Sequence, residues 1–356
     1  MSKKVAPDEN LVRIVHLFVP GLEVLETTPI ITGHINQTFR IRYKRESKEG
    51  SFLLQNLNTH VFRNPEAVMH NIVRCSKFME TLGDAYPMEI LRPQVLSDES
   101  SYLYRESENA WRLFNFIENT TSLNFIETEE QAHEIGKAFG VFLASINQDD
   151  PDQYQVTIPD FHNFTKRYQE FDRFLKEKYA ATFDDRTRQL LEDIHRYAPP
   201  YIQLEEKDFP VRIAHHDTKA NNILLDQQTG KPRAVIDLDT LMPGDIFSDY
   251  GDLIRTVLNP YEEDKFPDSE TRVDPGIYAV LHTSFLDPLR QILTEKEMKY
   301  LNVGGKKIIL LQVIRFLEDH LRGDVYYQVR YDGHNLDRAW SQMNLFKAID
   351  QTELNI

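Results

Sequence analysis

The alternation of apolar and polar residues in the first third of the chain predicts β-strands. Phe39, Ile41 and Tyr43 alternate with polar residues, which is the period of a strand with one buried face. One helix interrupts the strands: Asn64 is a good N-cap and Pro65 suits the first helical position, and the apolar residues that follow recur on one helical face. Further strands are expected at residues 51–57, 101–104 and 111–116.

Beyond residue 117 the apolar period becomes that of amphipathic helices. Thr128 and Gln131 match a capping box, and the segment behind them repeats Ile135, Phe139 and Phe142 on one face. Further helices are expected around 164–178, 186–197, 306–321 and 338–349, with short apolar strands at 211–214 and 234–238. Strands followed by helices are typical of an α+β fold. We therefore expect a strand-rich lobe over residues 1–116 and a larger helical lobe over 117–356.

Composition narrows the class of protein. The 356 residues carry 41 Lys and Arg against 56 Asp and Glu, a net charge of −15, which disfavours nucleic acid or an anionic membrane surface as partner. The single cysteine, Cys75, excludes an intrachain disulfide and fits a reducing compartment. Neither a signal peptide nor an apolar run of the roughly 20 residues that span a membrane is found. We expect a cytoplasmic protein with no membrane contact; the sequence does not indicate its oligomeric state.

Several enzyme signatures are absent from the sequence. The glycines show no G-x-G spacing, so the dinucleotide fingerprint is missing, and no Walker A loop occurs. The serine-hydrolase elbow G-x-S-x-G and the zinc-protease motif H-E-x-x-H are missing as well. Any catalytic chemistry must therefore rest on another constellation.

That constellation lies in residues 213–226. His215, His216 and Asp217 are followed five residues later by Asn222, the H-x-D-x-x-x-x-N spacing of a kinase catalytic loop. Asp237 follows twenty residues after Asp217, at the end of a short apolar strand. A carboxylate that receives a hydroxyl proton, with Asn and Asp oxygens that bind Mg²⁺, are the groups that phosphoryl transfer requires. Each residue alone has an ordinary structural interpretation as a turn residue; their joint order favours catalysis.

These segments resemble the aminoglycoside-phosphotransferase-like small-molecule kinases, and more narrowly the N-acetylhexosamine 1-kinase branch. The resemblance rests on residues 215–222 and 235–255, and on four further segments, 32–39, 53–72, 111–120 and 315–342. It covers roughly residues 30 to 345. It implies a protein-kinase-like two-lobed fold, ATP and Mg²⁺ as cosubstrates, and transfer of the γ-phosphoryl group to a sugar hydroxyl.

The resemblance also implies roles for residues around the catalytic loop. Asp217 matches the catalytic base, and Asn222 and Asp237 match the magnesium ligands. Lys219 is expected to meet the γ-phosphate, or else to be a solvated loop lysine. Asp239 is expected either to line the acceptor site or to cap the strand end. His215 is expected to brace the loop, and Asp249 matches an acidic residue that holds it.

On the nucleotide side the sequence departs from protein kinases. Gln55 stands where the strand lysine is expected, and Asn71 stands where the helix would carry its partner glutamate. An amide–amide hydrogen bond between them is one interpretation; the other is a shifted helix in which Glu66 provides the acid. The loop that covers the phosphates has a single glycine, Gly33, which with Asn36 is expected to turn the backbone onto phosphate.

The remaining candidate residues are expected to bind adenine or the acceptor. The backbone near Phe114 and Phe116 should form the hinge that binds the adenine edge. Arg315 is a candidate for hydrogen-bonding sugar oxygens, or a salt-bridged structural arginine. His34 is a candidate for reaching the acceptor across the cleft, or else a loop histidine. An arginine there suits a neutral polyhydroxyl acceptor and would repel a polycationic aminoglycoside. Three further side chains are candidates for the wall of the acceptor pocket, with the core as the alternative for the tyrosines: Tyr326, Tyr327 and His334.

The sequence therefore predicts a phosphotransferase that converts an N-acetylhexosamine to its 1-phosphate. One alternative is the same fold acting on another sugar or small alcohol, as choline and aminoglycoside kinases do. The choline form is disfavoured because no acidic or aromatic cage is evident. A second alternative is a nucleotide-binding regulatory protein without turnover. GTP remains an alternative donor to ATP.

Overall fold

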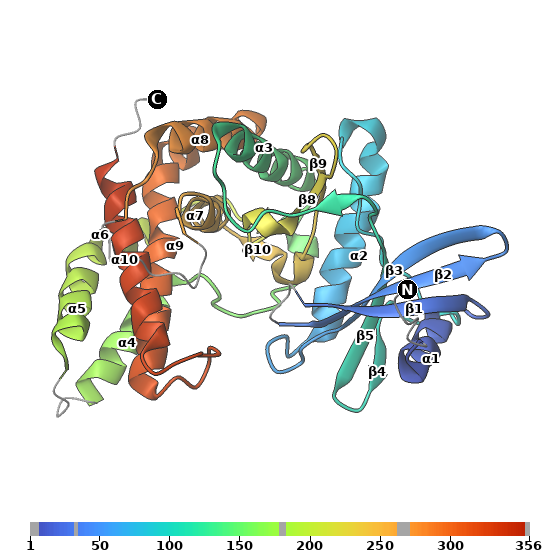
Figure 1. The fold of residues 1–356 in the computed structure, drawn as a ribbon. Coiled ribbons are helices and arrows are strands. Elements are labelled where there is room, and N and C mark those ends of the chain that lie inside the picture. The colour runs from blue at the N-terminus through green and yellow to red at the C-terminus, as the bar shows by residue number, and fades with distance from the viewer. Residues whose placement is uncertain (1–6, 32–34, 178–182, 262–270, 353–356) are drawn as a thin grey trace.

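The strands near the N-terminus form one antiparallel sheet. The computed structural model describes residues 7–31, 35–177, 183–261 and 271–352, and the five strands of the sheet lie in the order β1-β2-β3-β5-β4. Figure 1 places this sheet at one end of the molecule and most helices at the other. The strands are β1 (Glu23–Ile30), β2 (Gln37–Arg45), β3 (Lys48–Asn56), β4 (Tyr104–Glu106) and β5 (Asn109–Asn115).

A helix covers each face of the sheet. On one face, α1 (Glu9–Phe18) buries Ile14 and Val15 against Leu54 and Leu113. The sequence reading missed α1, although its apolar residues recur at helical spacing and Asp8 caps its first turn. Because side chains alternate along a strand, the neighbours of Leu113 on β5 face the other helix.

That second helix, α2 (Pro65–Leu82), lies between the two lobes. Asn64 caps it and Pro65 opens it, as predicted. Its Val68 and Ile72 join a buried cluster with Phe114, and the same cluster continues into the helical part of the chain. Helix α2 therefore packs against the sheet and the second lobe at once (Figure 1).

The second lobe consists mainly of helices, and the capping box of Thr128 and Gln131 is confirmed at the start of its first helix. None of its described helices, nor any other in the described part of the chain, is long and apolar enough to cross a membrane. The helices are α3 (Glu129–Ile146), α4 (Phe164–Glu177), α5 (Asp185–Tyr197), α6 (Pro199–Glu205), α7 (Ile246–Val257), α8 (Pro275–Leu289), α9 (Glu295–Arg322) and α10 (His334–Gln351). A strand-rich lobe followed by a helical lobe, the predicted architecture, is confirmed.

Short strands of the second lobe hold the predicted catalytic turns. β7 (Arg212–Ala214) pairs with β10 (Met242–Gly244), and β8 (Ile223–Asp226) pairs with both β6 (Thr120–Thr121) and β9 (Pro232–Val235). The catalytic loop connects β7 to β8, and the second acidic turn connects β9 to β10. Two separate strand pairings therefore fix the ends of both turns.

Helices α7 and α9 cross at very short range. Gly251 on α7 lies against the backbone of Gly305, and Gly304 lies against the ring of Phe247. A Cβ atom at any of these three glycines would overlap its neighbour. Glycine is therefore required here by the close approach of the two helices.

Three predicted boundaries differ in the structure. The strand expected at 101–104 forms only from Tyr104, and the strand expected at 234–238 ends at Val235, because residues 238–240 turn into a short 3₁₀ helix. The helix expected at 306–321 is the second half of α9. Each difference lies at an element end, where local sequence pattern carries the least information.

Candidate active site

Asp217 lies in the loop after β7, and its carboxylate is held by two neighbours. Lys219 Nζ is 2.9 Å from Oδ1. Asn222 Nδ2 donates to Oδ2 at 3.1 Å and to the Asp217 carbonyl at 2.8 Å. Burial favours the neutral acid, but the charge and hydrogen bond of Lys219 outweigh it and hold the pKa of Asp217 below its usual value. The side chain is therefore an ionised, oriented acceptor for a hydroxyl proton.

The backbone just before Asp217 is fixed by Asp249 on α7. The two carboxylate oxygens of Asp249 accept the N–H of His215 at 3.0 Å and of His216 at 2.6 Å. His216 has a φ of 62°, a left-handed conformation that costs a non-glycine residue about 1 kcal/mol or more. Asp249 is thus placed to hold the loop in this strained form, the role that the resemblance implies.

His215 connects the catalytic loop to the second acidic turn. Its Nδ1 accepts the N–H of Asp217 at 3.3 Å, so its Nε2 is the donor to the carbonyl of Ile236 at 3.0 Å. The ring is fully buried, and burial lowers its pKa. A neutral, doubly hydrogen-bonded ring braces the loop, which agrees with the role expected for it.

Asp237 follows Ile236 and also has a left-handed backbone, with a φ of 61°. Although the residue is open to solvent, desolvation of its carboxylate, followed by the charges of Asp239 and Asp217, raises its pKa to about 7. Of these three carboxylates, Asp217 is paired with Lys219 and Asp239 with Arg112, and the negative charge of Asp237 would be stabilised by a cation.

The residues predicted as metal ligands fit Mg²⁺. Both hydrogen bonds of Asn222 to Asp217 use its amide nitrogen and not its carboxamide oxygen, the atom that a hard cation prefers. Asp237 supplies a carboxylate. Within the described ranges no three His, Cys, Asp or Glu side chains form a complete metal site. One or two protein oxygens completed by substrate phosphates are the usual ligands of Mg²⁺ in kinases.

Asp239 lies in a different environment from Asp237. Arg112 Nη1 is 2.6 Å from its Oδ1, and Arg112 Nη2 donates to its Oδ2 at 2.9 Å. Asn36 Nδ2 donates to the same Oδ2 at 2.7 Å. The carboxylate expected to line the acceptor site or to cap the strand is therefore buried between two groups of the other lobe. Sequence reasoning missed Arg112 altogether.

Gln55 and Asn71 do not form the amide pair suggested by the sequence, and that interpretation is wrong. Gln55 Oε1 accepts Arg112 Nε at 3.1 Å and Nη2 at 2.9 Å. Asn71 Nδ2 donates to the carbonyls of Gln155 and Leu241, each at 2.7 Å. Asn71 thus ties α2 to the second lobe rather than to the sheet.

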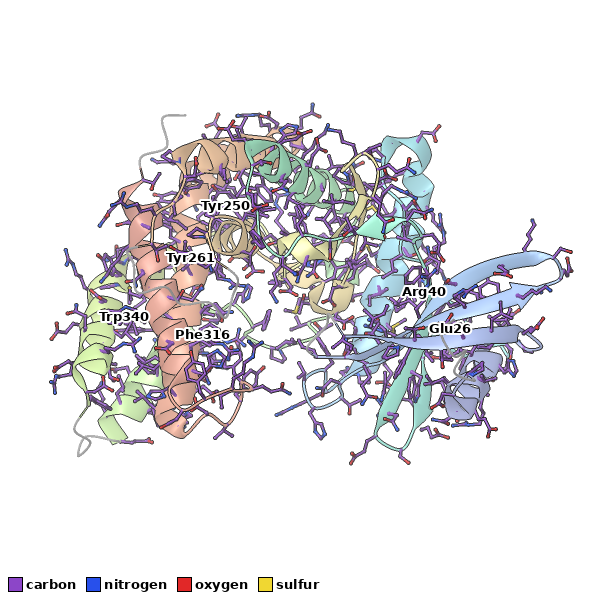
Figure 2. The ribbon with its side chains drawn as sticks, viewed as in Figure 1. Glu26, Arg40, Tyr250, Tyr261, Phe316 and Trp340 are labelled. Atoms are coloured by element: carbon purple, nitrogen blue, oxygen red, sulfur yellow. The ribbon has the colours of Figure 1, made fainter. Side chains whose placement is uncertain are left out.

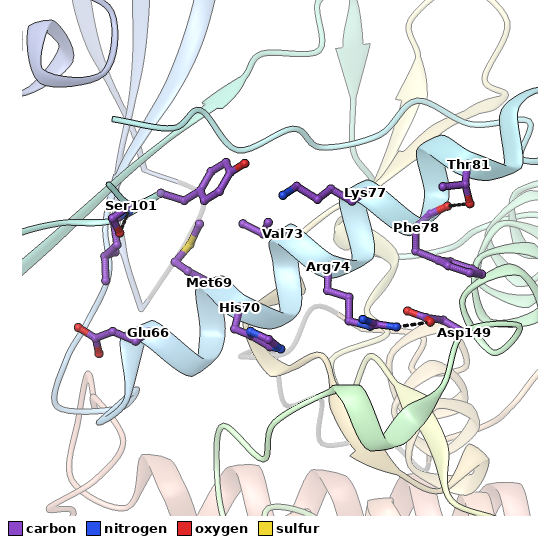
Figure 3. A pocket seen from close by; sticks show the side chains of 12 residues that line it. Glu66, Met69, His70, Val73, Arg74, Lys77, Phe78, Thr81, Ser101 and Asp149 are labelled. Carbon is purple, nitrogen blue, oxygen red and sulfur yellow. Dashed lines mark hydrogen bonds and ion pairs between the residues drawn. The ribbon is translucent and has the colours of Figure 1, made fainter. Parts of the chain in front are cut away.

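Glu66, the other suggested acid, points away from this network. It is exposed and lines a groove of about 580 Å³ on the outer face of α2 (Figure 3). The groove also contains Lys77 and the Arg74–Asp149 ion pair, whose atoms are 2.5 Å apart. Apart from Glu66, none of the predicted site residues lines it, so this cavity is separate from the predicted active site.

Phe114 and Phe116 occupy contrasting positions at the predicted hinge. Phe114 is fully buried, with its ring 5.2 Å from the guanidinium carbon of Arg112. Phe116 lies 4.6 Å from the guanidinium of Arg40 (Arg40 is labelled in Figure 2). The carbonyl of Ile117 accepts the hydroxyl of Thr120 at 2.9 Å. Contact of this backbone with adenine stays a prediction.

Arg315, predicted to bind the acceptor, lies on α9 and is surrounded by aromatic rings. Its guanidinium carbon lies 5.6 Å from the ring centre of Phe161, 6.0 Å from that of Tyr326 and 5.6 Å from that of Tyr327. No Asp or Glu among the described residues pairs with it. The salt-bridged alternative for this arginine is therefore not what the described residues form.

The aromatic wall around Arg315 consists of Phe161, Tyr326 and Tyr327. Phe161 was not predicted to belong to it. Phe161 stacks on His162 at 4.4 Å, and His162 contacts the ring of His216 at 5.3 Å, which joins the wall to the catalytic loop. His334, predicted in the wall, is instead fully buried, and its Nδ1 accepts the N–H of Arg330. Gly33 and His34 lie outside the described residues.

The fold and these turns define a two-lobed small-molecule kinase. Comparison with protein families gives the same class: residues 26–269 match the model of the phosphotransferase enzyme family. That match covers more than half of the chain, so the protein belongs to this family of phosphotransferases, whose members phosphorylate hydroxyl groups.

Solved structures similar to this one share its fold. The aminoglycoside phosphotransferase of Alicyclobacillus acidocaldarius matches with a TM-score of 0.63 at 13% identity, over 98% of both chains. A spectinomycin phosphotransferase, in complex with ADP and spectinomycin, gives 0.60 at 14% identity over 97% of this chain and 98% of that one. Choline kinase of Cryptosporidium parvum gives 0.56 at 15% identity over 97% and 96%. These similarities confirm the predicted kinase-like fold.

Proposed function

We propose that the protein is an ATP- and Mg²⁺-dependent kinase that phosphorylates the anomeric hydroxyl of an N-acetylhexosamine. The observation that carries the proposal is the position of an ionised Asp217, paired with Lys219, on a loop joined through His216 and His162 to the wall around Arg315. A proton acceptor and a cation that no described Asp or Glu pairs with thus belong to one continuous proposed site.

In the proposed reaction, Asp217 aligns the acceptor hydroxyl and receives its proton as the new O–P bond forms. The bond between the γ-phosphorus and the bridging oxygen of ATP breaks, and ADP leaves. Lys219 exchanges its contact with Asp217 for the transferring phosphoryl group, where its charge stabilises the transition state. Mg²⁺, when bound between Asn222 and Asp237, would neutralise charge on the phosphates.

The surroundings of Arg315 support a neutral polyhydroxyl acceptor. Its guanidinium has five N–H donors, and none is used by a described carboxylate. These donors suit the hydroxyl and carbonyl oxygens of an N-acetylated sugar, and the rings of Phe161 and Tyr326 suit its apolar face.

The same surroundings disfavour choline and aminoglycosides. An aromatic cage could bind a quaternary ammonium group, but here the rings already surround the guanidinium of Arg315. A second cation would be repelled at that position. Choline kinases and aminoglycoside kinases are nevertheless similar folds, so both acceptors belong in the test.

The test is ADP release from ATP and Mg²⁺ with a panel of acceptors. The panel contains free N-acetylglucosamine and N-acetylgalactosamine, their methyl glycosides, other free hexoses, choline and an aminoglycoside. Turnover with the free N-acetylhexosamines and none with their methyl glycosides is expected, because the glycosides lack the anomeric hydroxyl. Turnover with choline or the aminoglycoside alone would reassign the acceptor. No ADP release with any member, while ATP still binds, would support a regulatory protein.

A further inference from the structure

Arg112 is a buried cation on the sheet whose contacts cross from one lobe to the other. It lies on β5 directly opposite Gln55 on β3, on the face covered by α2. Its side chain is 2% exposed and that of its partner Asp239 is 4% exposed. A charge this deep is stable only when it is paired and hydrogen-bonded.

The guanidinium is fully committed to protein partners. Nε and Nη2 donate to Gln55, and Nη1 and Nη2 contact both carboxylate oxygens of Asp239. The ring of Phe114 lies beside it, and the sulfur of Met69 on α2 is 4.0 Å from Nη1. Figure 3 shows Met69 on α2, where it also lines the outer groove. Arg112 is therefore enclosed and not presented to a phosphate group.

Asp239 connects three segments of the chain through its carboxylate. It lies two residues after the metal-site candidate Asp237, in the same turn. Besides Arg112 it binds Asn36, whose Oδ1 accepts the N–H of Asn58 at 3.0 Å. The turn before β2, the strand β5 and the acidic turn of the second lobe are thus linked through Asp239.

We propose that the Arg112–Asp239 ion pair replaces the strand-lysine–helix-glutamate pair of protein kinases as the contact that sets the distance between the lobes. Arg112 is then a positioning residue: it holds the turn of Asp237 and the segment of Asn36 where the metal–nucleotide complex binds. Protein kinases use their lysine to bind phosphate as well, whereas here the cation serves the protein alone. The proposal rests on phosphoryl transfer but not on the identity of the acceptor.

The test measures nucleotide affinity, which needs no acceptor. The dissociation constant of ATP is determined by calorimetry with excess Mg²⁺ and again with EDTA, for wild type, Arg112→Met, Arg112→Lys and Asp239→Asn. Lys347→Met is the matched control, because Lys347 is paired at 2.5 Å with the buried Asp193, which joins α10 to α5 away from the cleft.

We expect the affinity for ATP to fall in the presence of Mg²⁺ and to stay the same in EDTA. Arg112→Met and Asp239→Asn should each weaken ATP binding in Mg²⁺ by about 100-fold, the scale of a misplaced site, and leave the value in EDTA unchanged. Their double variant should be no worse than the weaker single one, and Arg112→Lys should recover part of the loss. Lys347→Met should lower the Tm without changing either affinity.

Two results would overturn the proposal. Equal weakening with Mg²⁺ and with EDTA would show that the pair does not act by positioning the metal-binding turn. Behaviour of Arg112→Met and Asp239→Asn like that of Lys347→Met, with a lower Tm and unchanged affinities, would make the pair a purely structural contact. Should Arg112→Met not fold, Asp239→Asn alone still separates these outcomes, because it keeps a hydrogen-bonding side chain of the same shape.

Discussion

The proposed active site has a nucleotide side and an acceptor side, each with an arginine, and the surroundings of the two arginines are opposite. Arg112, on the nucleotide side, is buried and has Gln55 and Asp239 as partners. Arg315, on the acceptor side, is half-buried among aromatic rings and has no described acidic partner. The contrast illustrates two uses of the arginine side chain. A fully paired guanidinium stabilises the arrangement of the protein itself, whereas a guanidinium without a described acidic partner is available to bind a ligand.

The largest expected effect concerns the base between the two sides. Asp217→Asn removes the proton acceptor and keeps the shape of the side chain, so kcat should fall by about 10³-fold. ATP affinity, measured by calorimetry, should remain within a few-fold of wild type. Turnover close to wild type in this variant would assign the base to another residue.

The next largest difference is expected in the free energy of unfolding, which substitution of Arg112 should lower more than substitution of Arg315. Arg112→Met leaves Asp239 buried and partly unpaired, which should cost about 3–5 kcal/mol in the free energy of unfolding. In Arg315→Met no described carboxylate loses an ion-pair partner. The loss in the free energy of unfolding should therefore stay below about 1 kcal/mol. Urea unfolding followed by circular dichroism measures both, and equal losses would remove the basis of the comparison.

For acceptor binding, measured by kinetics, the order of the two arginines should be reversed: Arg315 should matter more than Arg112. Arg315→Met should raise the KM of the acceptor by about 10- to 100-fold, the scale of one or two hydrogen bonds from a charged donor, and leave the KM of ATP unchanged. Arg315→Lys should recover part of the loss because it keeps the charge but not the planar fork. An unchanged acceptor KM in Arg315→Met would place the sugar elsewhere.

A smaller effect should follow from loosening the aromatic wall. Asp319 on α9 accepts the N–H groups of Val325, Tyr326 and Tyr327 and an amide hydrogen of Asn335. In Asp319→Asn one of the two accepting oxygens is lost, so the acceptor KM should rise about tenfold, the scale of one hydrogen bond. The KM of ATP serves as the internal control, and a parallel rise in both would indicate general loosening instead.

The smallest expected effect concerns a buried neutral group of the helical lobe. Burial lowers the pKa of His282, which is hydrogen-bonded to the hydroxyl of Tyr250, to about 4. In the unfolded chain the pKa is about 6.5, so stability from a neutral His282 is complete above that pH and is lost as the pH falls. The stability advantage of wild type over His282→Gln should therefore shrink by about 1 kcal/mol between pH 6.5 and 5.5. The difference between the two proteins cancels the other titrating groups, and a constant difference would contradict the lowered pKa.

The sequence was most informative where the chemistry lies within one short segment. Asp217 and Asn222 are five residues apart on one loop, so their spacing alone predicts that they belong to one site, and the alternation of apolar and polar residues predicts strands of the sheet. The contact of Arg112 with Asp239 spans 127 positions of the chain, and nothing local marks either residue as a partner of the other.

Other misses have equally specific physical causes. Phe161 belongs to a connection without periodic pattern, where no buried face can be inferred from spacing. Asn71 was aligned by its distance along the chain from Gln55, but the rotation of α2 turns it toward Leu241. The rotation of α2 about its axis depends on its packing against both lobes. The sequence of the helix alone therefore does not predict it.

The close crossing of α7 and α9 has a consequence for how the acceptor site can change. Asp249, which holds the catalytic loop, lies two residues before Gly251, and Arg315 lies ten residues beyond Gly305 on a continuous helix. At about 1.5 Å per residue, Arg315, the proposed acceptor-binding cation, lies about 15 Å along α9 from the backbone contact between Gly251 and Gly305. In the proposed site, new acceptor preferences can therefore arise by exchanging side chains on α9 beyond this crossing, because the register between Asp217 and Arg315 is set by the close approach of the helices at three glycines.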